Sequence, residues 1–288
     1  MKNGHENIYT MSGVRDLLSR HGINLRKSLG QNFLTDPNIP EKIVRLSGID
    51  GRCGVLEIGP GVGALTAALA GAAGHVTAVE LDSRLMPVLG DTVGSLPNVA
   101  VVQGDILKID IGSLVGGAMQ GMRLHVCANL PYSITTPALT AVIETGLFDT
   151  ITVMVQREVA RRICSGPGTA DYSAFTVYVN YHALPQMLFD VPPDCFMPRP
   201  KVHSTVISLK TRGKRLLAPE YEAVFFRFTR AAFGQRRKTL ANALHSAFGG
   251  SMNKPEIAAL IEKCGFDADI RGEKLSMDDF IALVTELK

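Results

Sequence analysis

The chain has 288 residues, of which 46% are hydrophobic and 20% charged, which is typical of a globular protein with one large α/β domain or one domain and a smaller second one. No apolar stretch approaches the roughly 18 residues of a membrane span, and the polar start MKNGHENIYT lacks the apolar core of a signal peptide. Five scattered cysteines without a C-x-x-C pair, and histidines without ligand spacing, argue against a disulfide framework or a zinc site and predict a reducing, cytoplasmic compartment without a bound metal.

The net charge of +3 is unevenly distributed along the chain. Between Arg199 and Lys238, eleven Lys and Arg residues stand against two acidic residues, so this window carries +9 and the remainder carries −6. A local basic block in a near-neutral protein is typical of a surface that binds a polyanion, and equally of an ordinary solvated surface. Charge alone does not choose between these two interpretations.

The first half of the chain alternates between helix and strand signals. We expect a disordered tail over residues 1–9, an amphipathic helix over 11–22, an ordered loop over 26–36 and a helix that begins at Asp36-Pro37. The later elements are predicted as a strand and glycine loop over 54–63, a helix from 64, a strand over 75–82, a helix over 83–93, strands over 98–105 and 124–130, a helix over 135–146, and a strand running into a helix over 150–163. Such alternation predicts a parallel sheet with helices on both faces.

The second half of the chain changes character. Residues 173–183 and 203–210 are rich in Val, Thr, Tyr and Ile, so we expect strands that close the sheet with an antiparallel edge. From 211–220 onward every periodic segment predicts a helix. The sequence therefore predicts an α/β domain over residues 1–212 and a small all-helical domain over 213–288.

A glycine-rich turn, Glu57-Ile-Gly-Pro-Gly-Val-Gly63, follows the first of these strands and opens a helix. Glycines such as Gly59 and Gly61 let the backbone turn sharply and approach a ligand, and the helix N-terminus offers free N–H groups. Glu80, at the end of the next strand, can accept hydrogen bonds from both hydroxyls of a ribose. The pattern favours a nucleoside-containing cofactor, although tight turns of this kind also occur without any ligand.

Asp105 ends the third strand, where its carboxylate can bind an adenine amine while Ile106 packs on the ring. Acids at the ends of two successive strands suit S-adenosylmethionine better than a dinucleotide. The spacing Gly59-x-Gly61-x-x-Ala64 also satisfies the dinucleotide fingerprint, so a nicotinamide-dependent oxidoreductase is a distant alternative. Nothing further along the chain resembles a nicotinamide site.

The fourth strand ends in Asn129-Leu130-Pro131-Tyr132, at the sheet edge where α/β proteins bind ligands. The nitrogen of an aromatic amine is a poor nucleophile because its lone pair is delocalised into the ring. The side-chain oxygen of Asn129 and the carbonyl of Leu130 could hold both hydrogens of such an amine and direct its lone pair at a methyl donor. Pro131 fixes the turn and Tyr132 can stack on the base. The plainer interpretation is a capped turn with a packing tyrosine.

Several motifs, in the same order, resemble the ribosomal RNA adenine dimethyltransferases, and above all the bacterial members that dimethylate two adjacent adenosines near the end of small-subunit rRNA. The resemblance extends from about residue 11 to the C-terminus. The motifs are K-S-L-G-Q-N-F-L (27–34), E-I-G-P-G (57–61), Glu80, Q-G-D (103–105), N-L-P-Y (129–132), F-M-P-R-P-K-V-H-S (196–204) and A-F-G-Q-R-R-K-T-L (232–240).

The resemblance implies a Rossmann-like class I methyltransferase sheet and assigns roles to individual residues. It implies that the S-adenosylmethionine site comprises Asn32, Leu34, Gly59, Glu80, Asp105 and Asn129, with Gln31 beside them. It also implies that Phe196 clamps the target base opposite Tyr132, and that Arg230, Arg236, Arg237 and Lys238 of the helical domain bind RNA phosphates. The family pattern often has Pro at Arg199 and Asp at His203, which leaves the detail of this loop open.

We therefore expect a monomeric enzyme that methylates small-subunit rRNA within a pre-ribosomal particle and releases S-adenosylhomocysteine. Two alternatives stay open at this point. A large-subunit rRNA methylase conferring antibiotic resistance shares N-L-P-Y, although A-F-G-Q-R-R-K-T-L favours the small-subunit enzyme. A non-catalytic assembly factor could retain the same fold, although the intact Glu80, Asp105 and Asn129 argue against it.

Overall fold

The computed structural model describes residues 6–23 and 31–287. Contacts between residues divide the chain into two compact units, Met1–Ala160 with Gln186–Thr211, and Arg161–Pro185 with Arg212–Lys288. The expected division between residues 212 and 213 therefore misplaces 161–185, which belong with the helical unit. Within the described residues, no helix is long and apolar enough to cross a membrane.

The first unit is built on a seven-stranded sheet of order β4-β3-β2-β5-β6-β9-β7. Its strands are β2 (Cys53–Ile58), β3 (His75–Glu80), β4 (Val99–Gln103), β5 (Arg123–Asn129), β6 (Thr150–Gln156), β7 (Ala183–Val191) and β9 (Ser204–Thr211). Strands β4, β3, β2, β5 and β6 are parallel, and β9 pairs antiparallel with β6. This confirms the predicted parallel sheet with an antiparallel edge.

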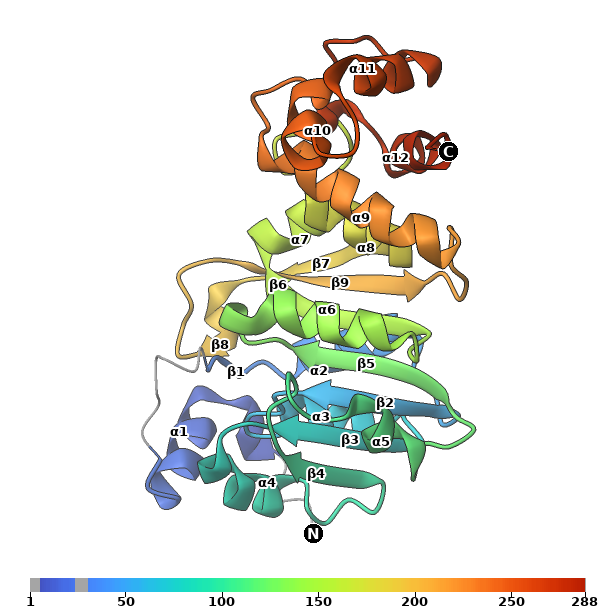
Figure 1. The fold of residues 1–288 in the computed structure, drawn as a ribbon. Coiled ribbons are helices and arrows are strands. Elements are labelled where there is room, and N and C mark those ends of the chain that lie inside the picture. The colour runs from blue at the N-terminus through green and yellow to red at the C-terminus, as the bar shows by residue number, and fades with distance from the viewer. Residues whose placement is uncertain (1–5, 24–30, 288) are drawn as a thin grey trace. The chain divides into compact units, whose positions relative to one another are not determined.

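Helices cover both faces of this sheet, as Figure 1 shows, with α2 and α3 on one face and α5 and α6 on the other. The helices of this part of the chain are α1 (Met11–Arg20), α2 (Asn38–Ser47), α3 (Ala64–Ala70), α4 (Met86–Thr92), α5 (Ile111–Gly116) and α6 (Thr135–Thr145). The next helix, α7 (Arg157–Cys164), begins in this unit and ends in the second. Two short strands, β1 (Phe33–Leu34) and β8 (Phe196–Met197), pair antiparallel outside the main sheet. The predicted loop over 26–36 is described only from Gln31 onward.

The predicted disordered tail over residues 1–9 is wrong for its second half. Glu6–Tyr9 form a 3-10 helix, Ile8 is buried in a cluster with α1, and the Tyr9 hydroxyl donates to the backbone carbonyl of Ala64 over 3.2 Å. Burial of the Ile8 side chain, about 2 kcal/mol in general, offsets part of the entropy cost of ordering this segment. Residues 1–5 lie outside the described residues.

The second unit is helical, with α8 (Ala174–His182), α9 (Pro219–Gly234), α10 (Leu240–Phe248), α11 (Lys254–Lys263) and α12 (Met277–Thr285). The predicted strand over 173–183 is wrong, because this segment forms α8. Ser173 and Thr176 cap its start reciprocally, and Val177 and Tyr181, one helical turn apart, enter the core of the unit. Tertiary packing and the cap thus outweigh the β propensity of the Val, Thr and Tyr side chains.

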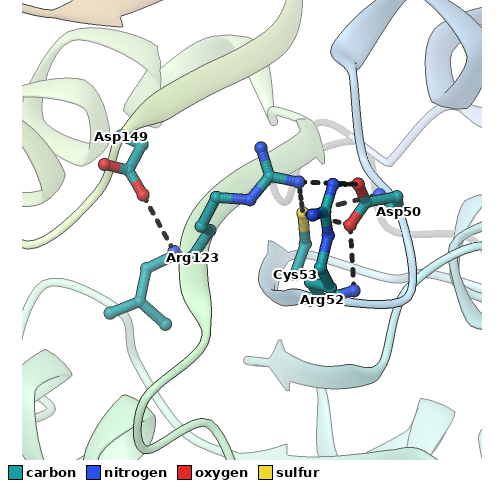
Figure 2. A network of polar contacts seen from close by, with 6 residues as sticks. Asp50, Arg52, Cys53, Arg123 and Asp149 are labelled. Atoms are coloured by element: carbon teal, nitrogen blue, oxygen red, sulfur yellow. Dashed lines mark hydrogen bonds and ion pairs between the residues drawn. The ribbon is translucent and has the colours of Figure 1, made fainter.

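The amino-terminal edge of the sheet is tied by polar contacts that Figure 2 shows. Arg123, at the start of β5, donates to the Asp50 carboxylate over 2.7 Å, and the backbone N–H of Leu124 donates to Asp149 over 3.2 Å. The same Asp50 also binds Arg52, just before β2. These contacts hold the starts of β2 and β5 in register. They do not involve the carboxyl ends of the strands, which lie at the opposite side of the sheet.

Candidate active site

One cavity opens at the carboxyl edge of the sheet, where β2, β3, β4 and β5 end. All nine residues predicted to hold the cofactor line it: Gln31, Asn32, Leu34, Gly59, Gly61, Glu80, Asp105, Ile106 and Asn129. Leu130, Pro131 and Tyr132 line it as well. Segments separated by up to a hundred residues therefore meet around one space, as expected for strand ends in an open α/β sheet.

The glycine turn after β2 needs its glycines for two separate reasons. Gly59 and Gly61 have φ angles of +70° and +62°, which side chains other than that of glycine rarely adopt. A Cβ atom on Gly61 would also lie 2.8 Å from the ring of Phe33. The β1 segment therefore lies directly on the turn, and the turn forms one wall of the cavity.

Glu80 is held in place at the end of β3 by backbone donors. One carboxylate oxygen accepts the N–H of Gly61 over 3.2 Å, and the other accepts the N–H of Asp82 over 2.8 Å. Burial raises the pKa of the Glu80 carboxyl, and these hydrogen bonds act in the opposite direction. Each oxygen keeps a second lone pair, so the fixed carboxylate can still accept hydrogen bonds from ligand hydroxyls.

Asp105 is oriented by its own loop after β4. Its carboxylate accepts the N–H of Leu107 over 3.0 Å and lies 3.5 Å from the Lys108 ammonium. The neighbouring Ile106 is buried and also lines the cavity. The loop thus places a carboxylate beside an apolar side chain, which is the combination that a flat base with an exocyclic amine requires.

Glu57 is a cavity residue for which the sequence analysis assigned no role. It lies on β2 with 1% of its surface exposed, and one of its oxygens has no hydrogen-bond partner among the described residues. Burial, and after it the charge of nearby Glu80, raise the pKa of the Glu57 carboxyl to about 8. The sequence signal was present, because this acid opens the E-I-G-P-G motif inside an otherwise apolar strand.

The Glu57 carboxyl makes the stability of the ligand-free protein depend on pH. The folded state keeps this proton up to a pH of about 8, while the unfolded chain releases it near the usual 4.5. The free energy of unfolding should therefore decrease between these values, by about 1.4 kcal/mol per pH unit. Chemical unfolding of wild type and Glu57→Gln at pH 5, 6, 7 and 8 measures this. In the variant, the free energy of unfolding should no longer show the decrease with pH that is due to Glu57. Parallel curves of unfolding free energy against pH for the two proteins would contradict a raised pKa of Glu57.

Asn129 ends β5, and the orientation of its side chain is fixed. Its Nδ2 donates to the backbone carbonyl of Asn32 over 3.0 Å. Because a carbonyl oxygen can only accept, the amide nitrogen must be the atom that faces Asn32, and Oδ1 is directed away from it. The contact therefore leaves a carboxamide oxygen at the cavity as a hydrogen-bond acceptor.

The following residues form a rigid turn. The N–H of Leu130 donates to the carbonyl of Met154 on β6 over 3.2 Å, and Pro131 continues with a φ of −56°. The hydroxyl of Tyr132 lies 2.8 Å from that of Ser204, which is fully buried at the start of β9. Ser204 is a supporting residue that the sequence analysis did not single out, although it closes the F-M-P-R-P-K-V-H-S motif.

Phe196 is placed differently from the other predicted site residues. It is 1% exposed, pairs in register with Leu34 and packs in a core cluster that includes Met154 and Val206. It is not among the residues that line the cavity. Its role as the second aromatic contact of a target base stays a prediction, while in this structure it acts as a core residue.

Comparison with known proteins places this arrangement in a family. Residues 22–288 match the family described as "Ribosomal RNA adenine dimethylase". The protein named "Ribosomal RNA small subunit methyltransferase A" of Shouchella clausii is 44% identical over 283 residues, which cover 98% of this chain and 96% of the relative. The protein of the same name from Lachnoclostridium phytofermentans is 45% identical over 270 residues, 93% of each chain.

The chain belongs to the ribosomal RNA adenine dimethylase family.

Solved structures agree with the family assignment. A dimethyladenosine transferase from Plasmodium falciparum superposes with a TM-score of 0.75 at 25% identity, over 88% of this chain and 96% of that one. The 23S rRNA methyltransferase ErmE superposes with a TM-score of 0.69 at 24% identity, over 88% and 99%. The latter likeness shows the shared fold. The predicted Rossmann-like class I methyltransferase sheet is confirmed.

The basic residues predicted to bind RNA phosphates all lie in the helical unit, but they differ in how many of their donors are already used within it. The Arg236 guanidinium donates to the carbonyls of Ala170 and Tyr172 over 3.0–3.2 Å and pairs with the Glu273 carboxylate at 3.2 Å. The exposed Arg237 and Lys238 have no side-chain hydrogen bond or ion pair within the described part of the chain.

Arg230 is also exposed, and its Nε donates to the carbonyl of Phe226 one turn earlier in α9. Arg236 thus already uses most of its donors inside the unit, whereas Arg237 and Lys238 keep theirs available. The four residues therefore comprise the internally bound Arg236, Arg230 with one donor used inside α9, and the two available cations Arg237 and Lys238.

Proposed function

We propose that this protein transfers methyl groups from S-adenosylmethionine to the exocyclic amine of two adjacent adenosines near the 3′ end of small-subunit rRNA. The observation that carries the proposal is the fixed amide of Asn129, which presents an oxygen to the cavity that all of the predicted cofactor residues line. Family membership and the names of the relatives at 44–45% identity support the same substrate class.

The residues of the cavity fit S-adenosylmethionine. One buried oxygen that lines it, on Gln31, has no hydrogen-bond partner among the described residues, so the cavity offers an acceptor to a ligand rich in donors. Glu80 would hold the ribose hydroxyls and Asp105 the adenine amine. When bound, this cofactor supplies an electrophilic methyl group on a positively charged sulfur.

The chain itself would act mainly by positioning the target amine. Asn129 Oδ1 and the Leu130 carbonyl accept the two amine hydrogens, so the nitrogen becomes more pyramidal and its lone pair is directed along one line. Tyr132, tied to Ser204, offers a flat face for the base, worth about 1–3 kcal/mol in general. No general base with a tuned pKa is required, because the alkylated nitrogen is acidic enough to release its proton to water. Positioning of this kind can lower a barrier by several kcal/mol.

The RNA would be held in part by exposed cations of the helical unit. Neutralising one phosphate changes the slope of log affinity against log salt by about 0.7–0.9. Arg237→Ala should therefore reduce that slope by about this amount, because its guanidinium has no internal partner. Arg236→Gln should leave the slope unchanged, since Arg236 is bound within the unit. Binding of small-subunit rRNA measured from 50 to 300 mM salt would show this, and equal slopes for Arg237→Ala and wild type would remove Arg237 from the contact.

The substrate particle is the part of the proposal that needs a direct test. Purified protein would be incubated with labelled donor and with isolated small or large ribosomal subunits from cells that lack the modification. We expect label only in the small-subunit RNA. We also propose that the enzyme acts as a monomer and that its substrate is a precursor particle. Label confined to the large subunit would instead support the resistance methylase, and absence of donor binding would support a non-catalytic assembly factor.

A further inference from the structure

A second pocket lies between α1 and the turn that follows β8. Its volume of about 570 Å³ is within the usual range of small-molecule sites. Figure 1 shows α1 next to β8, beyond the carboxyl ends of β2 and β3 and thus on the side of the sheet where the first cavity opens. We call this space the α1 pocket, and the residues that line it are Arg15, Leu18, Ser19, Gly22, Ile23, Met197 and Pro198. None of them lines the first cavity, so the two spaces are separate.

The α1 pocket and the first cavity meet at the short strands β1 and β8. Phe33 of β1 lines the cavity, and its partner in the antiparallel pair is Met197 of β8, which lines the α1 pocket. Paired strands lie about 5 Å apart, and paired side chains share a face. Both residues pack in the cluster that also contains Leu18 and Ile23. The two spaces are therefore close enough for neighbouring nucleotides of one RNA strand to occupy both.

The lining of the α1 pocket has the chemistry that a nucleotide requires. Its apolar surface comes from the buried Leu18 and Ile23 and from the more exposed Met197 and Pro198. Arg15 is the one charged residue of the lining, it is exposed, and it has no hydrogen bond or ion pair within the part of the chain that the structure describes. A guanidinium offers several donors to a phosphate, and an apolar surface can hold the flat face of a base.

We propose that the α1 pocket holds the nucleotide next to the adenosine that is being methylated, with its base on the apolar surface and its phosphate at Arg15. The inference rests on the proposed function, in which the two target adenosines are adjacent. Drawing the target base out of its stack costs free energy, and contacts made by the neighbouring base would offset part of that cost. Methylation of one adenosine would then depend on the base beside it.

Removal of the neighbouring base tests this dependence. Small subunits would carry a ligated rRNA end with both adenosines, or with an abasic site in place of one or the other. The single-turnover rate for the remaining adenosine is compared with the rate for the same adenosine in the unaltered RNA. The wild-type rate should fall about fivefold or more in the RNA whose abasic site lies on the side that the pocket serves, as for the loss of one stacked base.

A variant that fills the pocket should mimic the abasic site. Ser19 is exposed and lines the pocket, so the indole of Ser19→Trp would occupy the space of the base. We expect this variant to lose the same factor with unaltered RNA and to show no further loss with the abasic RNA. Ser12→Trp, also exposed on α1 but outside the pocket, is the matched control and should behave as wild type. All variants should keep the wild-type affinity for S-adenosylhomocysteine.

A charge variant tests the phosphate contact without altering the packing of α1. Arg15→Gln should reduce the slope of log RNA affinity against log salt by about 0.7, the value for one phosphate of a single strand. Arg20→Gln removes the same charge from the last turn of the same helix, outside the pocket, and should leave the slope unchanged.

Three results would overturn the inference while the proposed function stands. They are unchanged wild-type rates with both abasic RNAs, equal further losses on the abasic RNA in Ser19→Trp and wild type, and equal salt slopes for Arg15→Gln and Arg20→Gln. A loss in Ser19→Trp that occurs with intact subunits but not with the free RNA would assign the pocket to a ribosomal protein and would also overturn it. Absence of any methyl transfer by wild type to the unaltered subunits would instead overturn the proposed function.

Discussion

Asn129→Ala should lower methyl transfer at saturating donor and RNA by about a hundredfold or more, the usual cost of removing one group that acts on the reacting atoms. The variant loses the oxygen that holds the amine, so the lone pair is no longer aligned with the methyl group. The affinity for RNA should change little, because phosphate contacts dominate it. Single-turnover rates and RNA binding, measured on the same preparations, separate these two effects.

The design of that experiment must account for the second contact of Asn129. Alanine also removes the hydrogen bond to the Asn32 carbonyl, which helps to hold the segment beside the cofactor. The affinity for S-adenosylhomocysteine is therefore measured separately, and rates are compared only at saturation. Asn38→Ala, an exposed position outside the cavity, serves as the matched control and should keep wild-type rates. Near-normal methylation by Asn129→Ala would contradict the role given to this residue.

Gly61→Ala should damage both the fold and the cofactor site. The alanine would have to adopt a φ of +62°, which costs about 1–2 kcal/mol, and its Cβ would lie 2.8 Å from the Phe33 ring. Relief of that clash would displace Phe33 from the glycine turn and with it the segment that carries Gln31 and Asn32. We expect an affinity for S-adenosylhomocysteine at least tenfold lower and a free energy of unfolding lower by more than the φ cost alone.

Gly146 provides the control that isolates the backbone effect. It has a φ of +64°, nearly that of Gly61, but a Cβ there would meet nothing within 4 Å. Gly146→Ala should thus lose only about 1–2 kcal/mol of unfolding free energy and keep full affinity for the ligand. Indistinguishable results for the two variants, in denaturant titration and in calorimetry, would mean that the contact between Phe33 and the turn has no part in binding.

The sequence predicted the sheet and the cavity well because their signals are local and repeated. Strands β3, β4 and β5 end in polar residues, β2 is followed directly by the glycine turn, and parallel strands place all these ends at one side of the sheet. The order of strands and helices follows from the periodicity of their apolar residues. The site residues from Gly59 to Tyr132 could therefore be placed together from the sequence, whereas Gln31, Asn32 and Leu34 were assigned through the resemblance to the family.

Other features depended on contacts between distant residues and could not be predicted in this way. The helix α8 has the composition of a strand, and its cap and the core of the helical unit decide its form. Arg236 looks the same as Arg237 in the sequence, and only the carbonyls of Ala170 and Tyr172 distinguish it. The burial of Phe196 results likewise from pairing between β8 and β1.

The orientation of the two amides at the cavity is the clearest example. Gln31 and Asn129 were both predicted to bind the cofactor, yet nothing in the sequence indicates which atom of either amide faces the ligand. That depends on Asp82 in one case and on the Asn32 carbonyl in the other, and both partners belong to other segments or to the backbone. Pairwise contacts of this kind turn a set of site residues into a specific chemical arrangement.

The most direct test of the central claim is mass spectrometry of small-subunit rRNA from cells in which the gene has been deleted. The account predicts that the two adjacent dimethyladenosines near the 3′ end disappear and that wild-type protein restores them, whereas the Asn129→Ala variant at equal abundance does not. Persistence of both dimethyladenosines in the deletion strain, or their full restoration by Asn129→Ala, would contradict it.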